Sequence, residues 1–197
     1  MRGPTWEDVS GGVGLRVTVP VTMGPDEAAR ELAPCLSALA GERAPASSGE
    51  AGARPGVPVV TIDGYSGSGK STLAAALARL VNGWQVLHLD DWYPGWDGLA
   101  EGAHIARRIA ADLRGGRASS YEAWDWENGR TGATISVPLA PTIIEGCGAI
   151  DAEADLSVWI ADPGEDERRS RALARDGQTY APHWQRWADQ DLGRSLP

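Results

Sequence analysis

Phenylalanine is absent from this chain of 197 residues, cysteine occurs twice and lysine once. The two cysteines, Cys35 and Cys147, lack the paired spacing of metal sites, so we expect neither a structural zinc site nor a disulfide. The sequence also has no run of about 18 apolar residues and no basic segment followed by an apolar one. We therefore expect no membrane span and no secretory signal, and a cytoplasmic location.

Positive charge is scarce as well. The formal net charge is −9, the isoelectric point is about 4.8, and no basic stripe is visible outside one short segment near residue 170. A nucleic-acid partner is therefore not expected. Hydrophobic residues make up 42% of the chain, which at this length is enough to bury a core without disulfides or metal ions.

From residue 57 onward, short apolar runs alternate with helical patterns. The runs at residues 57–63, 84–90, 140–146 and 155–162 predict buried strands, and helices are predicted at 71–82, 101–113 and 164–175. Continuous apolar strands separated by helices are typical of an open parallel sheet that is covered on both faces. In such sheets, ligands bind at the carboxyl ends of the strands.

The first 56 residues differ in pattern. Residues 1–22 alternate weakly, as in a strand or an extension upstream of Met23, and residues 26–40 have helical spacing. Pro34 lies within that helical pattern and is expected to kink or end the helix unless it falls in a first turn. Residues 41–56 are rich in glycine, alanine, serine and proline and indicate a linker. We therefore predict an N-terminal extension and linker at 1–56, and one domain at 57–197.

The segment GYSGSGKS, residues 64–71, fits the phosphate-binding pattern G-x-x-x-x-G-K-S between a predicted strand and a predicted helix. Glycines let such a loop turn its backbone N–H groups toward an anion, and the following helix adds its positive dipole end. The alternative, a glycine-rich turn with a surface lysine, does not account for the spacing. The residues expected to bind the nucleotide are Gly64, Ser66, Gly67, Ser68, Gly69, Lys70, Ser71 and Thr72.

Lys70 is the only lysine among 18 lysine and arginine residues. An ammonium group is a compact point charge that can reach back over a phosphate loop, whereas the broad guanidinium group of arginine would not fit there. We expect Lys70 to contact the β- and γ-phosphates of ATP. Ser71 is expected to provide a hydroxyl group to Mg²⁺.

Acidic residues end two of the predicted strands. Asp90 and Asp91 are adjacent, so on a strand their side chains would point to opposite faces and only one would face the nucleotide. Asp90 is the candidate that orients an acceptor hydroxyl and takes its proton, although the pair could instead form a turn. Glu145 ends another strand and is expected to lie near Mg²⁺, with an ordinary strand-end carboxylate as the alternative.

The motifs GYSGSGKS, LDDWY, WDWENGR, IIEG and DERRSRALARD occur in an order that resembles the uridine kinase and phosphoribulokinase branch of the P-loop kinases, over residues 57–176. The resemblance implies a three-layer α/β fold of the P-loop NTPase type, with a mostly parallel five-stranded sheet and a lid near residues 163–180. It also implies transfer of the γ-phosphate of ATP, with Mg²⁺, to a hydroxyl group of a small molecule.

The resemblance assigns a role to each matching residue. It implies catalytic roles for Asp90, Lys70, Arg168, Arg171 and Arg175, and magnesium ligation by Ser71, Glu145 and Asp90. It implies acceptor contacts by Tyr93, Asp97, Trp124, Trp126 and Arg130. The segment between Trp126 and Arg130 is one residue shorter than in the uridine enzymes and lacks their histidine. An acceptor other than a pyrimidine nucleoside is therefore left open.

Four tryptophans fall in the loops expected to close over the acceptor: Trp92, Trp96, Trp124 and Trp126. Flat aromatic side chains in such loops can stack on a ring, which predicts a nucleoside-like or other ring-bearing acceptor. The alternative is that tryptophan replaces the missing phenylalanine in the core.

The arginines of the last predicted helix allow two interpretations. Acids and arginines four residues apart, such as Glu167 and Arg171, can pair in solvent and stabilise the helix. The same helix could also be a lid whose guanidinium groups neutralise a transferring phosphoryl group. Beyond it, the chain lacks the further strand that the family has. The sheet is then either incomplete at the C-terminus or completed from elsewhere, including the N-terminal segment.

Two function classes follow. The first is an ATP- and Mg²⁺-dependent kinase of a small hydroxylated molecule, and the second is a nucleotide-binding module without catalysis, which the short C-terminal part favours. A GTPase is disfavoured because the guanine-reading N-K-x-D motif needs a second lysine, and a transport ATPase lacks its L-S-G-G-Q signature. Homo-oligomer formation is left open.

Overall fold

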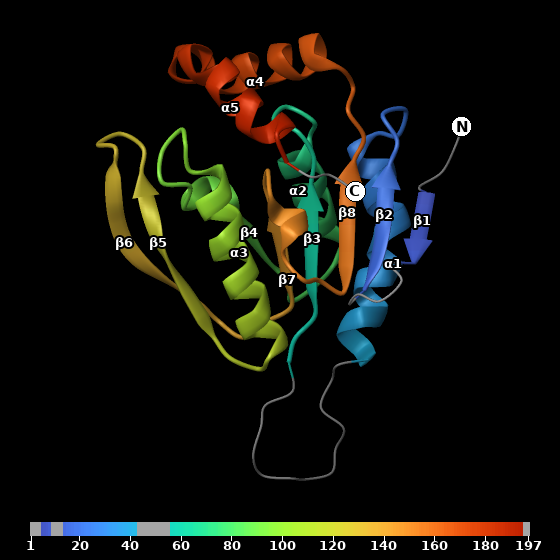
Figure 1. Cartoon of the computed structure of the whole chain (residues 1–197). Coiled ribbons are helices and arrows are strands. Elements are labelled where there is room, and N and C mark those ends of the chain that lie inside the picture. Colours follow the sequence, from blue (N-terminus) through green and yellow to red (C-terminus); the bar gives the residue numbers. More distant parts are fainter. Residues whose placement is uncertain (1–4, 9–13, 43–55, 195–197) are drawn as a thin grey trace.

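The computed structural model describes residues 5–8, 14–42 and 56–194 and has a six-stranded sheet at its centre, in the order β1-β2-β8-β3-β7-β4 (Figure 1). In that order the strands are Thr5–Asp8, Leu15–Val19, Leu156–Ile160, Val59–Asp63, Thr142–Glu145 and Gln85–His88. Strands β2, β8, β3, β7 and β4 pair in parallel, and β1 pairs antiparallel with β2. The predicted α/β fold with five parallel strands is confirmed.

Helices cover both faces of the sheet (Figure 1). Helices α1, Pro25–Glu42, and α2, Lys70–Leu80, lie on one face, and α3, Leu99–Arg114, lies on the other. Successive residues of β3 enter different cores: Val59 packs in the cluster that contains Ile109 of α3, whereas Val60 packs in the cluster that contains Leu73 of α2. The central strands are continuous apolar runs because both of their faces are buried.

The N-terminal segment completes the sheet. Strand β2 pairs with β8, with Val17 opposite Val158, and α1 packs against α2 through buried residues such as Leu32. The fifth parallel strand therefore precedes the phosphate loop in the chain instead of following the last helices. The expectation that this strand can come from the N-terminal segment is confirmed. The domain boundary at residue 56 stays a prediction, and residues 43–55 of the expected linker lie outside the described residues.

Helix α1 continues through Pro34, so of the two expected effects, a kink or an end of the helix, the end does not occur. Proline inside a helix removes one backbone hydrogen bond and crowds the preceding turn. Pro34 lies on the exposed side of α1. Leu32 and Leu36, on either side of it, are fully buried and hold both halves of the helix against the core.

Two elements differ from the sequence-based expectation. Strand β4 ends at His88, and the Asp90–Asp91 pair lies in a short 3₁₀ helix, Leu89–Asp91, not on the strand. An antiparallel hairpin of β5, Ser119–Asp125, and β6, Arg130–Val137, was not predicted. Its loop is residues 126–129 and ends in Asn128-Gly129, a pair typical of turns, in which Gly129 has a φ of 60°.

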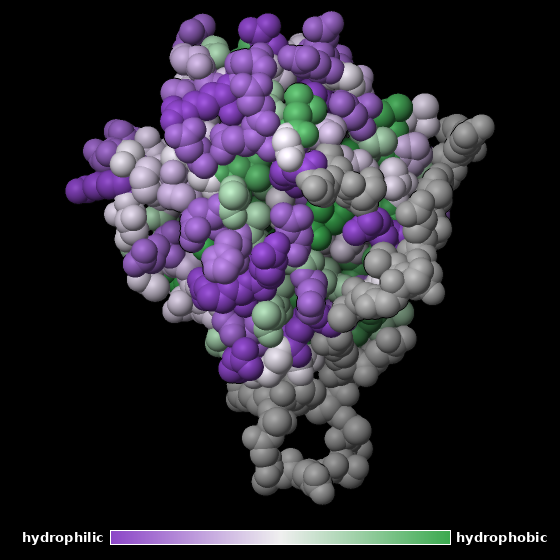
Figure 2. All heavy atoms as spheres, viewed as in Figure 1, coloured by the Kyte–Doolittle hydropathy of each residue, from purple (hydrophilic) through white to green (hydrophobic). Residues whose placement is uncertain are grey.

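The C-terminal residues cross the carboxyl ends of the strands (Figure 1). They form α4, Glu165–Tyr180, a 3₁₀ turn at Ala181–His183, and α5, Trp184–Leu192; we call residues 165–192 the α4–α5 arm. Gly177 interrupts the helical geometry of α4 with a φ of 57° and a ψ of −134°. Hydrophilic residues cover the outward surface of the arm (Figure 2). Among the helices that the structure describes, not one has the length and apolar character needed to cross a bilayer.

Candidate active site

The glycine-rich loop connects β3 to α2, as the sequence predicted. Gly67 and Gly69 have φ values of 80° and 106°, which side chains other than glycine rarely adopt. A Cβ atom at Gly67 would lie 2.2 Å from the carbonyl oxygen of Arg168. Glycine at this position therefore allows both the turn of the loop and the close approach of α4.

Lys70 folds back over this loop, where its side chain is buried. Its Nζ donates hydrogen bonds to the carbonyl oxygens of Gly64, at 2.7 Å, and Tyr65, at 3.1 Å, and contacts Sγ of Cys147 at 3.3 Å. Burial by itself lowers the pKa of Lys70, but the thiol of Cys147 and the carboxylates around the loop outweigh it, so that the pKa is raised. The ammonium group is therefore kept charged at the mouth of the loop.

A cavity of about 960 Å³ lies between the loop, the strand ends and the arm. The predicted site residues that line it are Ser66, Gly67, Gly69, Lys70, Ser71, Thr72, Asp90, Tyr93, Trp126, Glu145, Arg171 and Arg175. The cavity thus brings together the phosphate loop, the candidate base and two of the three candidate lid arginines. The other predicted residues, Gly64, Ser68, Asp97, Trp124, Arg130 and Arg168, do not line it.

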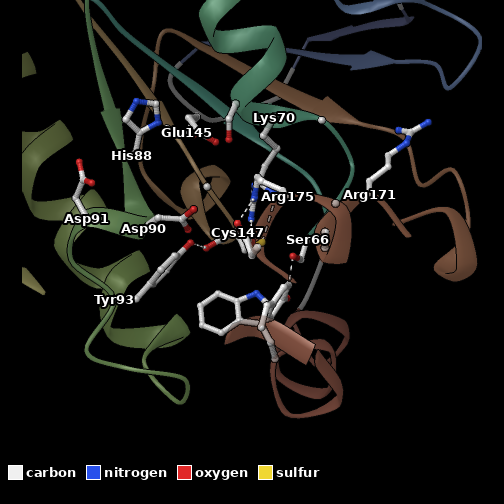
Figure 3. Close-up of a pocket in the computed structure, with 18 of the residues that line it drawn as sticks. Ser66, Lys70, His88, Asp90, Asp91, Tyr93, Glu145, Cys147, Arg171 and Arg175 are labelled. Atoms are coloured by element: carbon white, nitrogen blue, oxygen red, sulfur yellow. Dashed lines mark hydrogen bonds and ion pairs between the residues drawn. The ribbon is translucent and has the colours of Figure 1, made fainter. Parts of the chain in front are cut away.

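The side chains of Asp90 and Asp91 point in different directions. The carboxylate of Asp90 points toward the centre of the cavity near Tyr93, whereas that of Asp91 points away from it (Figure 3). Although Asp90 is open to the cavity, the surrounding protein desolvates it, and this together with the negative charge of Glu145 raises its pKa. A carboxylate with a raised pKa is a stronger proton acceptor.

Glu145 is buried and bonded to His88, which sequence reasoning missed. Nδ1 of His88 lies 2.6 Å from Oε1 of Glu145, and this hydrogen bond is the main reason why the pKa of His88 is raised. The two residues face each other because β4 and β7 are parallel neighbours that pair His88 with Glu145. The sequence did not reveal which strands are adjacent, so it held no signal for this contact.

Three side chains that line the cavity carry oxygen atoms of the kind that bind a magnesium ion. Ser71, Asp90 and Glu145 all line the cavity, and their hydroxyl and carboxylate groups are the hard ligands that Mg²⁺ prefers. No group of three or more histidine, cysteine, aspartate or glutamate side chains that could hold a metal ion occurs within the described residues.

Aromatic side chains line part of the cavity. Tyr93 is buried and donates a hydrogen bond to the carbonyl oxygen of Cys147 at 2.7 Å, and Nε1 of Trp126 donates to the carbonyl oxygen of Asp90 at 2.8 Å. The ring of Trp96 lies 4.8 Å from that of Trp126 and stacks on Tyr180 of the arm at 5.3 Å. Trp92 instead lies in the hydrophobic core, as the alternative interpretation expected for a tryptophan in place of phenylalanine.

Three of the residues expected to contact the acceptor lie away from the cavity. Asp97 pairs with Arg186 of the arm, at the surface. Trp124 and Arg130 lie on the hairpin, where Arg130 is exposed and pairs with Asp125 at 3.5 Å. The roles that the resemblance implies for these residues stay predictions.

The candidate lid arginines divide into two groups. Arg171 and Arg175 both line the cavity, where Arg171 pairs with Glu167 at 2.8 Å and Arg175 pairs with Asp176 at 2.6 Å. Arg168 is buried outside the cavity: its Nε donates to Asp162 at 2.8 Å, and its guanidinium group lies 4.9 Å from the centre of the Tyr65 ring. The hydrogen bond to Asp176 and the negative charges of Asp90 and Glu145 raise the pKa of Arg175, so this guanidinium group lies near the carboxylates of the cavity.

A buried ion-pair network, also missed in the sequence, joins the end of the chain to the loop. Arg194 donates to Asp63 at 2.8 Å and to Asp191 at 2.7 Å, and all three side chains are buried. Asp63, the last residue of β3, also accepts the backbone N–H of Gly64 at 2.6 Å and that of Gly148 at 3.0 Å. One arginine thus neutralises two carboxylates beneath the phosphate loop.

Replacing Arg194 with alanine should lower the free energy of unfolding by about 3–5 kcal/mol, because it leaves Asp63 and Asp191 buried without their cation. Urea unfolding followed by tryptophan fluorescence measures this change. Arg117→Ala is the matched control, since Arg117 is exposed and pairs with Asp112 at the surface; its cost should stay within about 1 kcal/mol. Equal costs for the two variants would contradict the structural role of Arg194.

Comparisons with known proteins return no match to a family model and no match to a curated protein. Among solved structures, a possible uridine kinase from Bacillus stearothermophilus is similar at 19% identity, over 82% of this chain and 92% of that chain, with a TM-score of 0.46. A candidate fructose transport system kinase from Silicibacter sp. TM1040 is similar at 22% identity, over 80% and 86%, with a TM-score of 0.47. At these values, the strand order and the loop of the chain itself carry the fold assignment.

Proposed function

We propose that the chain is a kinase that transfers the γ-phosphoryl group of ATP to a hydroxyl group of a small ring-bearing molecule, with Mg²⁺ as cofactor. One observation carries this proposal: Lys70 with its phosphate loop and the Asp90 carboxylate line the same cavity, which also has aromatic walls. A nucleotide-binding loop alone requires no carboxylate and no aromatic side chains in the same cavity.

The residues divide the reaction between them. Lys70 and the loop amides hold the phosphates, and Asp90 accepts the proton of the acceptor hydroxyl as its oxygen bonds to the γ-phosphorus. The bond from that phosphorus to the β,γ-bridging oxygen breaks, and ADP leaves. Arg175 neutralises charge on the transferring group. When bound at Ser71 and Glu145, Mg²⁺ would supply further charge neutralisation on the phosphate oxygens.

Acceptor-dependent release of ADP tests this proposal. The purified protein is incubated with ATP, Mg²⁺ and single members of a panel of nucleosides, sugars and vitamins, and ADP is followed by a coupled assay. At least one ring-bearing acceptor should raise the rate of ADP release well above the rate with water alone. ATP binding without any acceptor effect across the panel would contradict the kinase.

The second candidate is a nucleotide-binding module without catalysis, and the state of the loop favours it. The three donors of the Lys70 ammonium group already face two carbonyl oxygens and a thiol, and the Ser66 amide donates to Asp191 at 2.9 Å. On binding a nucleotide, the Lys70 ammonium group and the Ser66 amide could leave these partners and bind phosphate, and the loop would then switch between two states. This candidate predicts nucleotide binding whose strength and lifetime do not depend on any acceptor.

A further inference from the structure

Ser66 lies in the middle of the phosphate loop. Each of its three polar atoms forms a hydrogen bond with a different residue of the α4–α5 arm. Its backbone N–H donates to Oδ2 of Asp191 at 2.9 Å, and its carbonyl oxygen accepts from Nη1 of Arg168 at 3.3 Å. Its hydroxyl oxygen accepts from the hydroxyl group of Tyr180 at 2.9 Å. Three points along the arm, at the start of α4, at its end and in α5, thus meet on one loop residue.

These contacts are shielded from water. Ser66 is 8% exposed, and Asp191, Arg168 and Tyr180 are 1%, 4% and 3% exposed. Breaking any of these hydrogen bonds without a new partner would leave a buried polar atom unsatisfied, which is costly. The arm and the loop are therefore expected to move together.

The arm also approaches the loop through its backbone. The space that a side chain at Gly67 would need is filled by the carbonyl group of Arg168, so α4 rests directly on the loop. About two turns beyond Arg168, the same helix carries Arg175, which lines the cavity. The position of Arg175 therefore depends on the hydrogen bonds that hold the arm to Ser66.

We propose that Ser66 is a positioning residue that couples the phosphate loop to the α4–α5 arm, so that the loop, when it holds phosphate, keeps the arm and its Arg175 in place over the cavity. Ser66 would act through Tyr180, Asp191 and Arg168, and its side chain would take no part in the chemistry. The role in holding Arg175 near phosphate rests on the proposed function, whereas the coupling between loop and arm does not.

A double-mutant cycle tests the coupling, because Ser66→Ala and Tyr180→Phe remove the same hydrogen bond from its two ends. Amide hydrogen exchange of residues 165–192 is measured with and without ATP and Mg²⁺, and ATP affinity is measured by calorimetry. In the wild-type protein, ATP should slow exchange in the arm. At ATP concentrations that saturate each variant, each single variant should lose about five-fold of this added protection, and the double variant should lose no more than either one.

Tyr121→Phe is the matched control, because Tyr121 is also buried but its hydroxyl group faces Asp91 at 3.5 Å, away from the arm. It should leave the ATP-induced protection of the arm unchanged. A residue with only a structural role would speed exchange in the free protein but keep the increment that ATP adds. That result, or additive effects of the two variants, would overturn the proposal.

Failure of the proposed function would look different. If the wild-type protein binds neither ATP nor inorganic tripolyphosphate, the kinase proposal fails. The coupling between loop and arm is then tested by amide hydrogen exchange of residues 165–192 in the free protein. Ser66→Ala and Tyr180→Phe should then each speed arm exchange by about five-fold without adding to each other. Unchanged or additive exchange would reject the coupling as well.

Discussion

Replacing Asp90 with asparagine should lower the rate of phosphoryl transfer by about 10²–10⁴-fold while ATP binding stays nearly unchanged. Asparagine keeps the shape of the side chain and can still face the acceptor hydroxyl, but it cannot take up its proton. ADP release with the best acceptor of the panel measures the rate, and calorimetry measures the affinity for ATP. A variant that keeps more than about a tenth of the wild-type turnover would remove Asp90 from the role of base.

Asp91→Asn provides the matched control for this substitution. The two aspartates are neighbours in the same 3₁₀ turn, but the carboxylate of Asp91 points away from the centre of the cavity (Figure 3). Its replacement should change turnover by less than about ten-fold, because it does not reach the acceptor hydroxyl. Equal losses in the two variants would indicate a general electrostatic effect of this turn instead of proton transfer by one residue.

The pH dependence of the rate is a second test of Asp90 as the proton acceptor. Its pKa is raised by desolvation and by Glu145, so the carboxylate becomes protonated at a higher pH than an ordinary aspartate. Activity should therefore be present at higher pH and fall as the pH drops through this raised pKa. The acidic limb of the profile should disappear in the residual activity of Asp90→Asn.

Replacing Lys70 with methionine should weaken ATP binding by about 100-fold, because the phosphates lose hydrogen bonds from a charged donor in a buried site. Methionine keeps much of the length and apolar volume of the side chain. Lys70→Arg should not restore the affinity, since a planar guanidinium group does not fit the space between the Gly64 and Tyr65 carbonyl groups that the ammonium group occupies. Calorimetric titration with ATP and Mg²⁺ measures both variants.

Arg79→Met is the control for Lys70→Met. Both residues are cations on helix α2, but Arg79 is exposed and pairs with Asp26 at the surface. Its replacement should leave ATP affinity unchanged, which separates a specific phosphate contact from a general loss of positive charge on this helix. An Arg79 variant that loses as much affinity as the Lys70 variant would reject the specific contact.

The local part of the site was predictable from the sequence, and the distant part was not. The phosphate loop is a continuous segment of eight residues whose glycines, lysine and serine are adjacent in the chain. By contrast, Ser66 and Asp191 are 125 residues apart, and Asp63 and Arg194 are 131 residues apart. No periodicity or spacing pattern reports such pairs, because they depend on where the arm comes to lie.

The same distinction explains the fold. Apolar runs identified the parallel strands, since burial on both faces removes polar residues from them. The place of β2 beside β8 could be expected only as one of two alternatives, because strand order is a property of the sheet and not of any single segment. The hairpin was missed although Asn128-Gly129 indicates a turn, because the flanking tryptophans were interpreted only as site residues.

Calorimetric titration of the wild-type protein with ATP and Mg²⁺ tests whether the loop and Lys70 form a polyphosphate site. The structure predicts saturable binding of one nucleotide per chain with a dissociation constant of about a millimolar or lower, reduced by competing tripolyphosphate. A wild-type protein that folds normally but gives no binding heat at millimolar ATP and no competition would contradict a polyphosphate site there.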